Sequence, residues 1–196
     1  MSYEIVEEFE KEIAEFYGAP FSIAVDCCTH AIELCLRYLK PKKIAIPTHT
    51  YLSVAFLGDK LGIDWDWKDE NWKDYYYIGN TNVIDAAVLW KKDSYITNSF
   101  MCLSFQFQKH LNIGKGGMIL TDDENAFNFL KKMSHDGRDP KIPWRNQNIN
   151  HLGYHYYMTP ETAKLGLEKL PNAKKKKPKK WKITDWPDLR QMEIFK

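Results

Sequence analysis

The sequence predicts an α/β fold, a three-layer sandwich in which helices cover both faces of a mostly parallel sheet. The first observation is that short apolar runs typical of strands alternate along the chain with longer segments whose apolar residues recur at helical spacing. The second is that the helix predicted at residues 30–39 is apolar on most of its sides, as in a helix buried between layers. No internal repeat is evident.

Five helices and seven strands are expected. The first helix carries Val6, Phe9, Ile13 and Phe16 on one side. The other helices are predicted at residues 30–39, 50–62, 124–137 and 161–170. The strands are predicted at residues 22–25, 43–46, 63–65, 75–78, 82–87, 100–105 and 117–121.

Residues with known preferences for helix ends support these boundaries. Thr29 is a plausible N-cap for the helix at residues 30–39, and Gly62 ends the next helix. Asp122 or Asp123 can cap the helix at 124–137. Thr159, followed by Pro160 at the first helical position, opens the last helix.

The composition is that of one substantial domain with a tail. The chain has 196 residues, 44% of them hydrophobic and 14% aromatic, which is enough for a core and argues against global disorder. The composition changes at the lysine-rich stretch after Leu170, so we expect a core at residues 1–170 and a tail at 171–196.

Two features bear on where the protein works. No apolar run approaches the ~20 residues that span a bilayer, and the acidic, amphipathic N-terminus does not resemble a secretory signal. The four cysteines include no CxxC pair, which favours neither a zinc site nor a disulfide framework. We therefore expect reduced, mostly buried thiols in a cytoplasmic protein, with no metal and no membrane contact.

Four features fall at the carboxyl ends of predicted strands, where ligands of α/β sheets bind. Cys28 and Thr29 open a helix whose free N–H groups suit a phosphate. Asp85 ends a buried strand, where a carboxylate is costly unless it pairs with a cation. Ser104 ends another strand, where its hydroxyl suits the same phosphate, and Lys109 follows five residues later. Together these groups suit pyridoxal 5′-phosphate: the lysine forms a Schiff base and the carboxylate keeps the pyridine nitrogen protonated.

The motifs around these residues resemble, in the same order, those of the DegT/DnrJ/EryC1/StrS sugar aminotransferases, which belong to the fold-type I PLP-dependent enzymes. The segments that carry the resemblance are "CCTHAIEL", "PTHTYLSVAFLGDKLG", "VIDAA", "SFQFQKHLNIGKGGMILTDD" and "LGYHYYMTPETAKLGLEKL". They run from the first helix to Leu170, which implies the large domain of an aspartate aminotransferase-like transferase.

The resemblance also implies roles for individual residues. It makes Lys109 the Schiff-base lysine and Asp85 the partner of the pyridine nitrogen, and it places Tyr51 against the cofactor ring. Cys28 stands where the family has a glycine in its phosphate turn. His155 stands where the family has an asparagine that reaches the cofactor phosphate of the neighbouring subunit, which implies a homodimer with shared active sites.

The chain also departs from the family. The region between Trp65 and Val83 is shorter than usual and lacks a strand–helix unit. Val88 stands where the family has a polar residue, and we expect that the family's small C-terminal domain is missing from this form.

The predicted activity is transfer of an amino group from glutamate to a nucleotide-linked keto-sugar or a similar small carbonyl compound. Two alternatives stay open: a catalytically degenerate protein of this fold that binds a partner or nucleic acid, and a different PLP reaction on an amino acid. The run at residues 174–182 is rich enough in lysine to attract phosphate groups, although a solvated tail is the ordinary explanation. Trp181 and Trp186 suggest that this tail docks on the domain or on a partner subunit.

Overall fold

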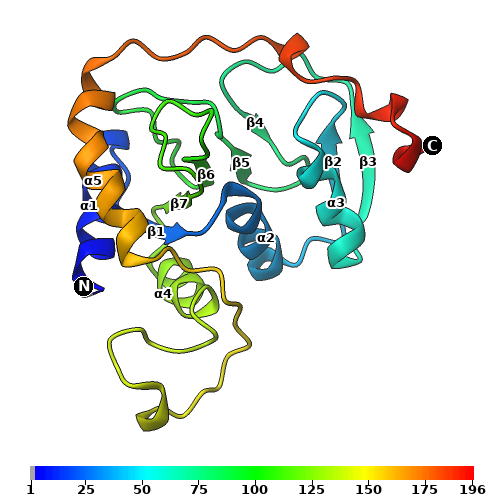
Figure 1. The fold of residues 1–196 in the computed structure, drawn as a ribbon. Coiled ribbons are helices and arrows are strands. Elements are labelled where there is room, and N and C mark those ends of the chain that lie inside the picture. Colours follow the sequence, from blue (N-terminus) through cyan, green and yellow to red (C-terminus); the bar gives the residue numbers. More distant parts are fainter. Residues whose placement is uncertain (1–2) are drawn as a thin grey trace.

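A computed structural model describes residues 3–196 of the protein, and Figure 1 shows how its elements are arranged. The helices are α1 (Glu4–Tyr17), α2 (Cys28–Leu39), α3 (Leu52–Leu61), α4 (Glu124–Met133) and α5 (Pro160–Lys175). The strands are β1 (Phe21–Val25), β2 (Lys43–Pro47), β3 (Asp64–Lys68), β4 (Tyr76–Tyr77), β5 (Val83–Asp85), β6 (Phe100–Ser104) and β7 (Gly117–Thr121). Every helix and strand expected from the sequence is present, so the α/β prediction is confirmed.

The strands form two sheets, which a β-bridge joins. The larger sheet has the order β1-β7-β6-β5-β4, and β2 pairs with β3 in a second, two-stranded sheet. An antiparallel bridge between Ala45 of β2 and Gly79, just after β4, connects the two sheets. The sheet therefore continues from one side of the molecule to the other.

The prediction of a mostly parallel sheet is wrong. The pairs β2–β3 and β5–β6 are parallel, whereas β1–β7, β6–β7 and β4–β5 are antiparallel. Parallel neighbours require a crossover connection, usually a helix. The loop at residues 105–116 joins β6 to β7 without a helix, and the short turn at 78–82 joins β4 to β5. Both connections return the chain alongside the strand it has just left.

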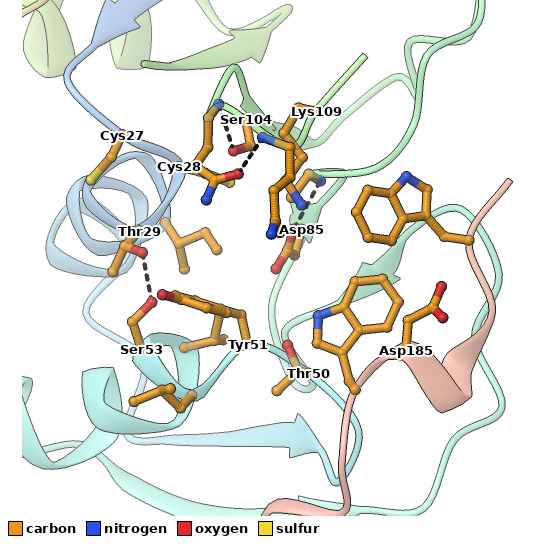
Figure 2. A pocket seen from close by; sticks show the side chains of 18 of the residues that line it. Cys27, Cys28, Thr29, Thr50, Tyr51, Ser53, Asp85, Ser104, Lys109 and Asp185 are labelled. Carbon is orange, nitrogen blue, oxygen red and sulfur yellow. Dashed lines mark hydrogen bonds between the residues drawn. The ribbon is translucent and has the colours of Figure 1, made fainter. Parts of the chain in front are cut away.

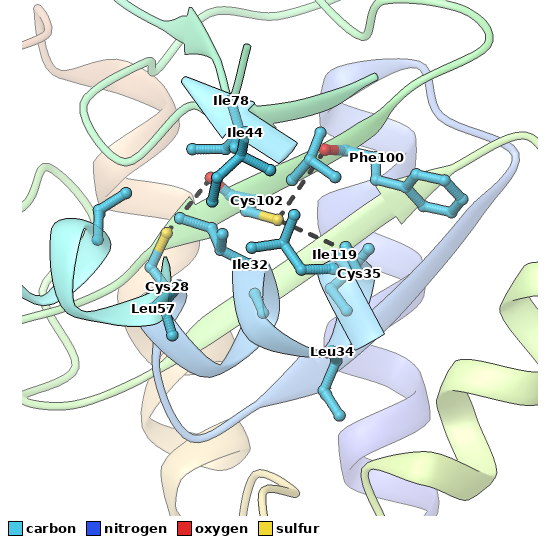
Figure 3. Close-up of a cluster of buried hydrophobic side chains, with 14 of the residues drawn as sticks. Cys28, Ile32, Leu34, Cys35, Ile44, Leu57, Ile78, Phe100, Cys102 and Ile119 are labelled. Atoms are coloured by element: carbon cyan, nitrogen blue, oxygen red, sulfur yellow. Dashed lines mark hydrogen bonds between the residues drawn. The ribbon is translucent and has the colours of Figure 1, made fainter. Parts of the chain in front are cut away.

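Side chains on the two faces of the larger sheet enter two separate hydrophobic clusters. Ile23, Cys102 and Ile119 pack with α2, α3 and α4. Figure 3 shows Cys102 and Ile119 beside residues of α2 and α3. The alternate residues Ala24 and Met101 pack on the other face with α1 and α5. This alternation is expected for strands buried on both faces and confirms the three-layer arrangement.

The capping residues expected from the sequence agree with the structure, with one exception. The predicted C-terminal ends of two helices differ, since α4 ends at Met133 rather than at 137 and α5 continues to Lys175 rather than ending at 170. Asp123 accepts a hydrogen bond from the Ala126 N–H, as expected for the N-cap of α4. Thr159 caps α5 in the same way. The expectation that Thr29 caps α2 is wrong, because α2 begins one residue earlier and its N-cap is Cys27.

The chain beyond α5 crosses the molecule to the opposite edge. Figure 1 shows it leaving the end of α5 and running past the ends of β4 and β5 towards β3. It then forms three short 3-10 helices at Ile183–Asp185, Leu189–Gln191 and Glu193–Phe195. Trp186 packs on Trp72 with ring centroids 4.9 Å apart, so the tail docks on its own domain. The division between core and tail at residue 170 stays a prediction, because α5 continues to Lys175.

Among the residues described, none of the helices is long and apolar enough to cross a membrane. The cysteines are free thiols, and Cys28, Cys35 and Cys102 are buried.

Gly117 permits a close approach between the start of β7 and the start of α2. A Cβ at this position would lie 2.4 Å from the carbonyl carbon of Cys27, which is backbone and cannot move aside. We expect Gly117→Ala to lower the free energy of unfolding by about 1–3 kcal/mol, the usual cost of overpacking. Gly116→Ala is the matched control, because the added methyl would meet the ends of the Ile113 and Met158 side chains, which can shift. Urea denaturation measures both; equal losses would contradict this account of Gly117.

Candidate active site

A cavity of about 550 Å³ lies at the carboxyl ends of β5 and β6. The first turn of α2, the start of α3 and the C-terminal segment form its other sides (Figure 2). Six of the seven site residues predicted from the sequence line it: Cys28, Thr29, Tyr51, Asp85, Ser104 and Lys109. The structure thus brings together groups from four separate segments of the chain.

The carboxylate of Asp85 is the most deeply buried charged group of the cavity, with 6% of the residue exposed. Its Oδ2 accepts a hydrogen bond of 2.5 Å from the Tyr76 hydroxyl, and its Oδ1 accepts one of 2.9 Å from the Ala87 N–H. Burial raises the pKa of Asp85, while the bond from Tyr76, the bond from Ala87 and the charge of Lys109 act in the opposite direction. The carboxylate is therefore held in place by two donors but is not fully compensated.

Lys109 lies in the loop between β6 and β7 and points into the cavity (Figure 2). Burial lowers its pKa because desolvation disfavours the ammonium form. The charge of Asp85 opposes this shift, and the charge of Lys179 adds to it. The Lys109 Nζ also lies 4.8 Å from the centroid of the Trp181 ring, a distance suited to a cation–π contact. The outcome is an amine that loses its proton more easily than an exposed lysine.

The groups predicted to bind phosphate gather beside the first turn of α2. The Thr29 hydroxyl lies 2.7 Å from the Ser53 hydroxyl, so the two form a pair at the cavity wall. The Ser104 Oγ accepts a long hydrogen bond of 3.5 Å from the Gln106 N–H. Cys28 is buried, its thiol donates to the Cys102 carbonyl, and burial raises the pKa of the thiol. Hydroxyl groups and a helix N-terminus therefore face the same space, an arrangement that suits an anion.

Tyr51 and His155 take different places. Tyr51 is the N-cap residue of α3, and the residue is 60% exposed at the edge of the cavity. His155 does not line the cavity. Its Nδ1 lies 2.9 Å from the Asp136 carboxylate, its Nε2 lies 3.0 Å from the Tyr157 hydroxyl, and its side chain is 72% exposed. Within one subunit His155 is thus a surface residue, and its role towards a neighbouring subunit stays a prediction.

Three contributors to the site were not found from the sequence. Tyr76 holds the Asp85 carboxylate, and the Thr50 hydroxyl makes a short hydrogen bond with the Tyr76 hydroxyl. Tyr76 lies in no distinctive pattern, since it belongs to a run of three tyrosines. Thr50 lies within the segment "PTHTYLSVAFLGDKLG", but the resemblance assigned it no role. The C-terminal segment lines the cavity with Trp181 and Trp186, whereas the sequence indicated only that these rings dock somewhere.

Asp26, Cys27 and His30 form a second polar cluster at the rim. Their potential ligand atoms lie within 4.8 Å of one another, a proximity that the cysteine spacing did not predict. The His30 Nδ1 lies 2.6 Å from the Asp26 carboxylate, and Lys115 forms an ion pair of 2.9 Å with the same carboxylate. Burial lowers the pKa of His30, but its contacts with Asp26 and Cys27 outweigh burial and raise the pKa to about 9. With two cationic partners, the Asp26 carboxylate is already neutralised.

Comparison of the sequence with known protein families shows to which family the chain belongs. The profile of the DegT/DnrJ/EryC1/StrS aminotransferase family matches residues 1–64 and 94–187. The chain belongs to this family. The unmatched stretch, residues 65–93, contains the shortened region noted in the sequence and also Asp85, so the case for Asp85 rests on its geometry. A comparison with curated protein sequences found no match.

Solved structures share the fold at low sequence identity. The sugar aminotransferase CalS13 from Micromonospora echinospora has a TM-score of 0.73 and 14% identity, and the match covers 87% of this chain and 61% of CalS13. A protein from Bacillus cereus, provisionally classed as a PLP-dependent aminotransferase, has a TM-score of 0.72 and 17% identity, with coverage of 87% and 58%.

A third similar structure is a mutant of GDP-4-keto-6-deoxymannose-3-dehydratase (ColD) with bound GDP-perosamine. It has a TM-score of 0.72 and 15% identity, with coverage of 87% and 61%. The chain spans about three fifths of the length of these proteins.

The titration of Asp85 gives a pH-dependent prediction for the protein without added cofactor. The folded-state pKa of Asp85 is raised, so the folded chain binds this proton more readily than the unfolded chain does. The stability that comes from the proton is complete below the unfolded pKa and is lost as the pH rises through the folded pKa.

Asp85→Asn removes this titration. As the pH falls from 7 towards ~4, the usual pKa range of a carboxyl group, the wild type should therefore gain stability relative to Asp85→Asn. Urea denaturation at a series of pH values measures the difference. A constant difference across this range would contradict the raised pKa.

Proposed function

We propose that the chain binds pyridoxal 5′-phosphate and acts as an aminotransferase. The observation that carries this proposal is the presence of Lys109 and Asp85 in one cavity, a lysine with a lowered pKa and a buried, incompletely compensated carboxylate. Asp85 ends β5, and Lys109 lies in the loop that follows β6, the parallel neighbour of β5. Ion-pair networks without a function also shift pKa values. Lys109 differs from such a case because its Nζ lies against an indole ring, within a cavity that is large enough for a ligand.

The residues around the cavity fit the separate parts of the cofactor. Asp85 would hold the pyridine nitrogen, because a buried carboxylate favours a protonated partner. The first turn of α2, with Thr29 and Ser104, would hold the phosphate. Tyr51 offers an aromatic face at the edge of the cavity. Each part of the cofactor thus meets a group of suitable charge or polarity.

The chemistry is divided between the cofactor and the chain. When bound, pyridoxal 5′-phosphate supplies an aldehyde and a ring that accepts electrons. Lys109 supplies the amine, and its lowered pKa increases the neutral, nucleophilic fraction. The flexible stem lets the Lys109 Nζ move aside for the substrate and then take up the proton from the substrate carbon. The hydrogen bonds from Tyr76 and Ala87 fix the position of the Asp85 carboxylate, which would face the positive charge of the pyridine nitrogen.

The proposed substrates follow from the family and its structural neighbours. We propose glutamate as the amino donor and a nucleotide-linked keto-sugar, or a similar small carbonyl compound, as the acceptor. The free thiols support a reducing compartment such as the cytoplasm.

One prediction of the proposed function concerns the reactive lysine. Incubation with pyridoxal 5′-phosphate, reduction with borohydride and peptide mapping should place the pyridoxyl group on Lys109. Lys115 is the internal control, since it pairs with Asp26 at the rim and its pKa is raised by that contact. Lys109→Ala should abolish the adduct and the turnover with glutamate while non-covalent cofactor binding persists. An adduct on Lys115, or on no lysine, would overturn the proposal in favour of a binding protein without turnover.

Another prediction of the proposed function concerns the assembly of subunits. We propose a homodimer in which the exposed segment around His155 faces the cavity of the second subunit. Sedimentation velocity should show a dimer. The exposed side chain of His155 should become protected from carbethoxylation when the cofactor is added. A stable monomer that binds the cofactor would contradict the proposed homodimer.

A further inference from the structure

The segment Trp181–Met192, which we call the C-terminal strap, forms one side of the cavity. Its residues that line the cavity are Trp181, Asp185, Trp186, Pro187, Leu189 and Met192. Figure 2 shows Asp185 on the side of the cavity opposite α2, across the cavity from Thr29. The strap is therefore positioned to meet whatever binds at Lys109.

Hydrogen bonds fix the strap to the connection between β2 and α3. The Leu189 N–H donates to the Thr48 carbonyl over 2.9 Å, and the His49 Nδ1 donates to the Trp186 carbonyl over 2.9 Å. Leu189 is 1% exposed, so its side chain is part of the core. The strap is thus an ordered element of the domain although it contains only short 3-10 helices.

Aromatic contacts extend this attachment into the cavity. Trp186 packs on Trp72, whose Nε1 donates to the His49 carbonyl over 2.7 Å. Trp181 packs on Trp186 with ring centroids 5.4 Å apart. The faces of the Trp181 ring are close to two cations, with the Lys179 Nζ 3.7 Å and the Lys109 Nζ 4.8 Å from its centroid. The indole pair therefore links the anchored part of the strap to the reactive lysine.

We propose that the strap is a wall of the reaction cavity and that Trp181 and Trp186 determine which molecules reach Lys109. The indole rings suit a ligand with a flat or ring-shaped body, and the Asp185 carboxylate suits hydroxyl groups on it. The ligand class is a polar ring compound carrying hydroxyls. The statement that this ligand is a substrate rests on the proposed function. The statement that the strap controls access to Lys109 does not depend on the proposed function.

Selectivity of Lys109 towards two aldehydes tests the proposal without turnover. Lys109 is reductively alkylated with formaldehyde, which is small, and with pyridoxal, which has a hydroxylated ring, and each rate is divided by that of Lys115 in the same molecule. Trp181→Ala and Trp186→Ala should lower the pyridoxal-to-formaldehyde ratio at Lys109 several-fold, because the ring loses its stacking partner. Trp144→Ala is the control, since Trp144 is 60% exposed and lies outside the cavity. An unchanged ratio in both folded variants would overturn the proposal.

A measurement on the wild type covers the case in which a variant fails to fold. Hydrogen exchange with and without pyridoxal 5′-phosphate should show slower exchange in the peptide at residues 181–192 and no change in α1. Labelling of Lys109 without protection of the strap would overturn the strap proposal and leave the proposed function standing. A changed aldehyde ratio without any pyridoxal phosphate adduct on Lys109 would overturn the proposed function and leave the strap proposal standing.

Discussion

The burial of the Asp85 carboxylate at the end of β5 is the constraint around which the cavity is built. A charge out of water is costly unless donors and counter-charges surround it. The Tyr76 hydroxyl and the Ala87 N–H supply two hydrogen bonds, and Thr50 holds the Tyr76 hydroxyl in turn. These contacts orient the carboxylate, but its pKa stays raised. A positive charge next to Asp85 would therefore stabilise the ionised carboxylate further. A cavity with this property favours a cationic ring.

The reversed direction of β7 brings the other half of the site to Asp85. Because β6 and β7 are antiparallel neighbours, the loop between them stays at one edge of the sheet and carries Lys109 into the cavity. β7 also lies next to β1, which places the start of β7 against the first turn of α2. Gly117 permits that contact, since any side chain there would overlap the backbone of Cys27. One strand direction thus positions the amine and the anion-binding turn together.

Local features were predictable from the sequence, and pairings between distant segments were not. Periodicity and end residues located the helices and strands, because these depend on neighbours a few residues apart. The direction of β4 depends on the turn at 78–82, which only pairing with β5 reveals. Thr29 fits the preferences of an N-cap, yet its hydroxyl turns to Ser53, 24 residues away. Six site residues were found because motifs carry them, whereas Tyr76 has no motif and acts only through tertiary contact.

The C-terminal strap acts on Lys109 in two opposing ways. It forms one side of the cavity that contains Lys109, and burial in this cavity disfavours the ammonium and lowers the pKa of Lys109. The Trp181 ring lies over the same amine and favours the ammonium, an effect of about 0.5–1 kcal/mol at exposed sites and more when desolvated. Burial outweighs the attractive charges, since the net direction is a lowered pKa. The strap that is proposed to select ligands thereby also influences the protonation of the Lys109 amine. One segment would thus affect both which molecules reach Lys109 and how reactive its amine is.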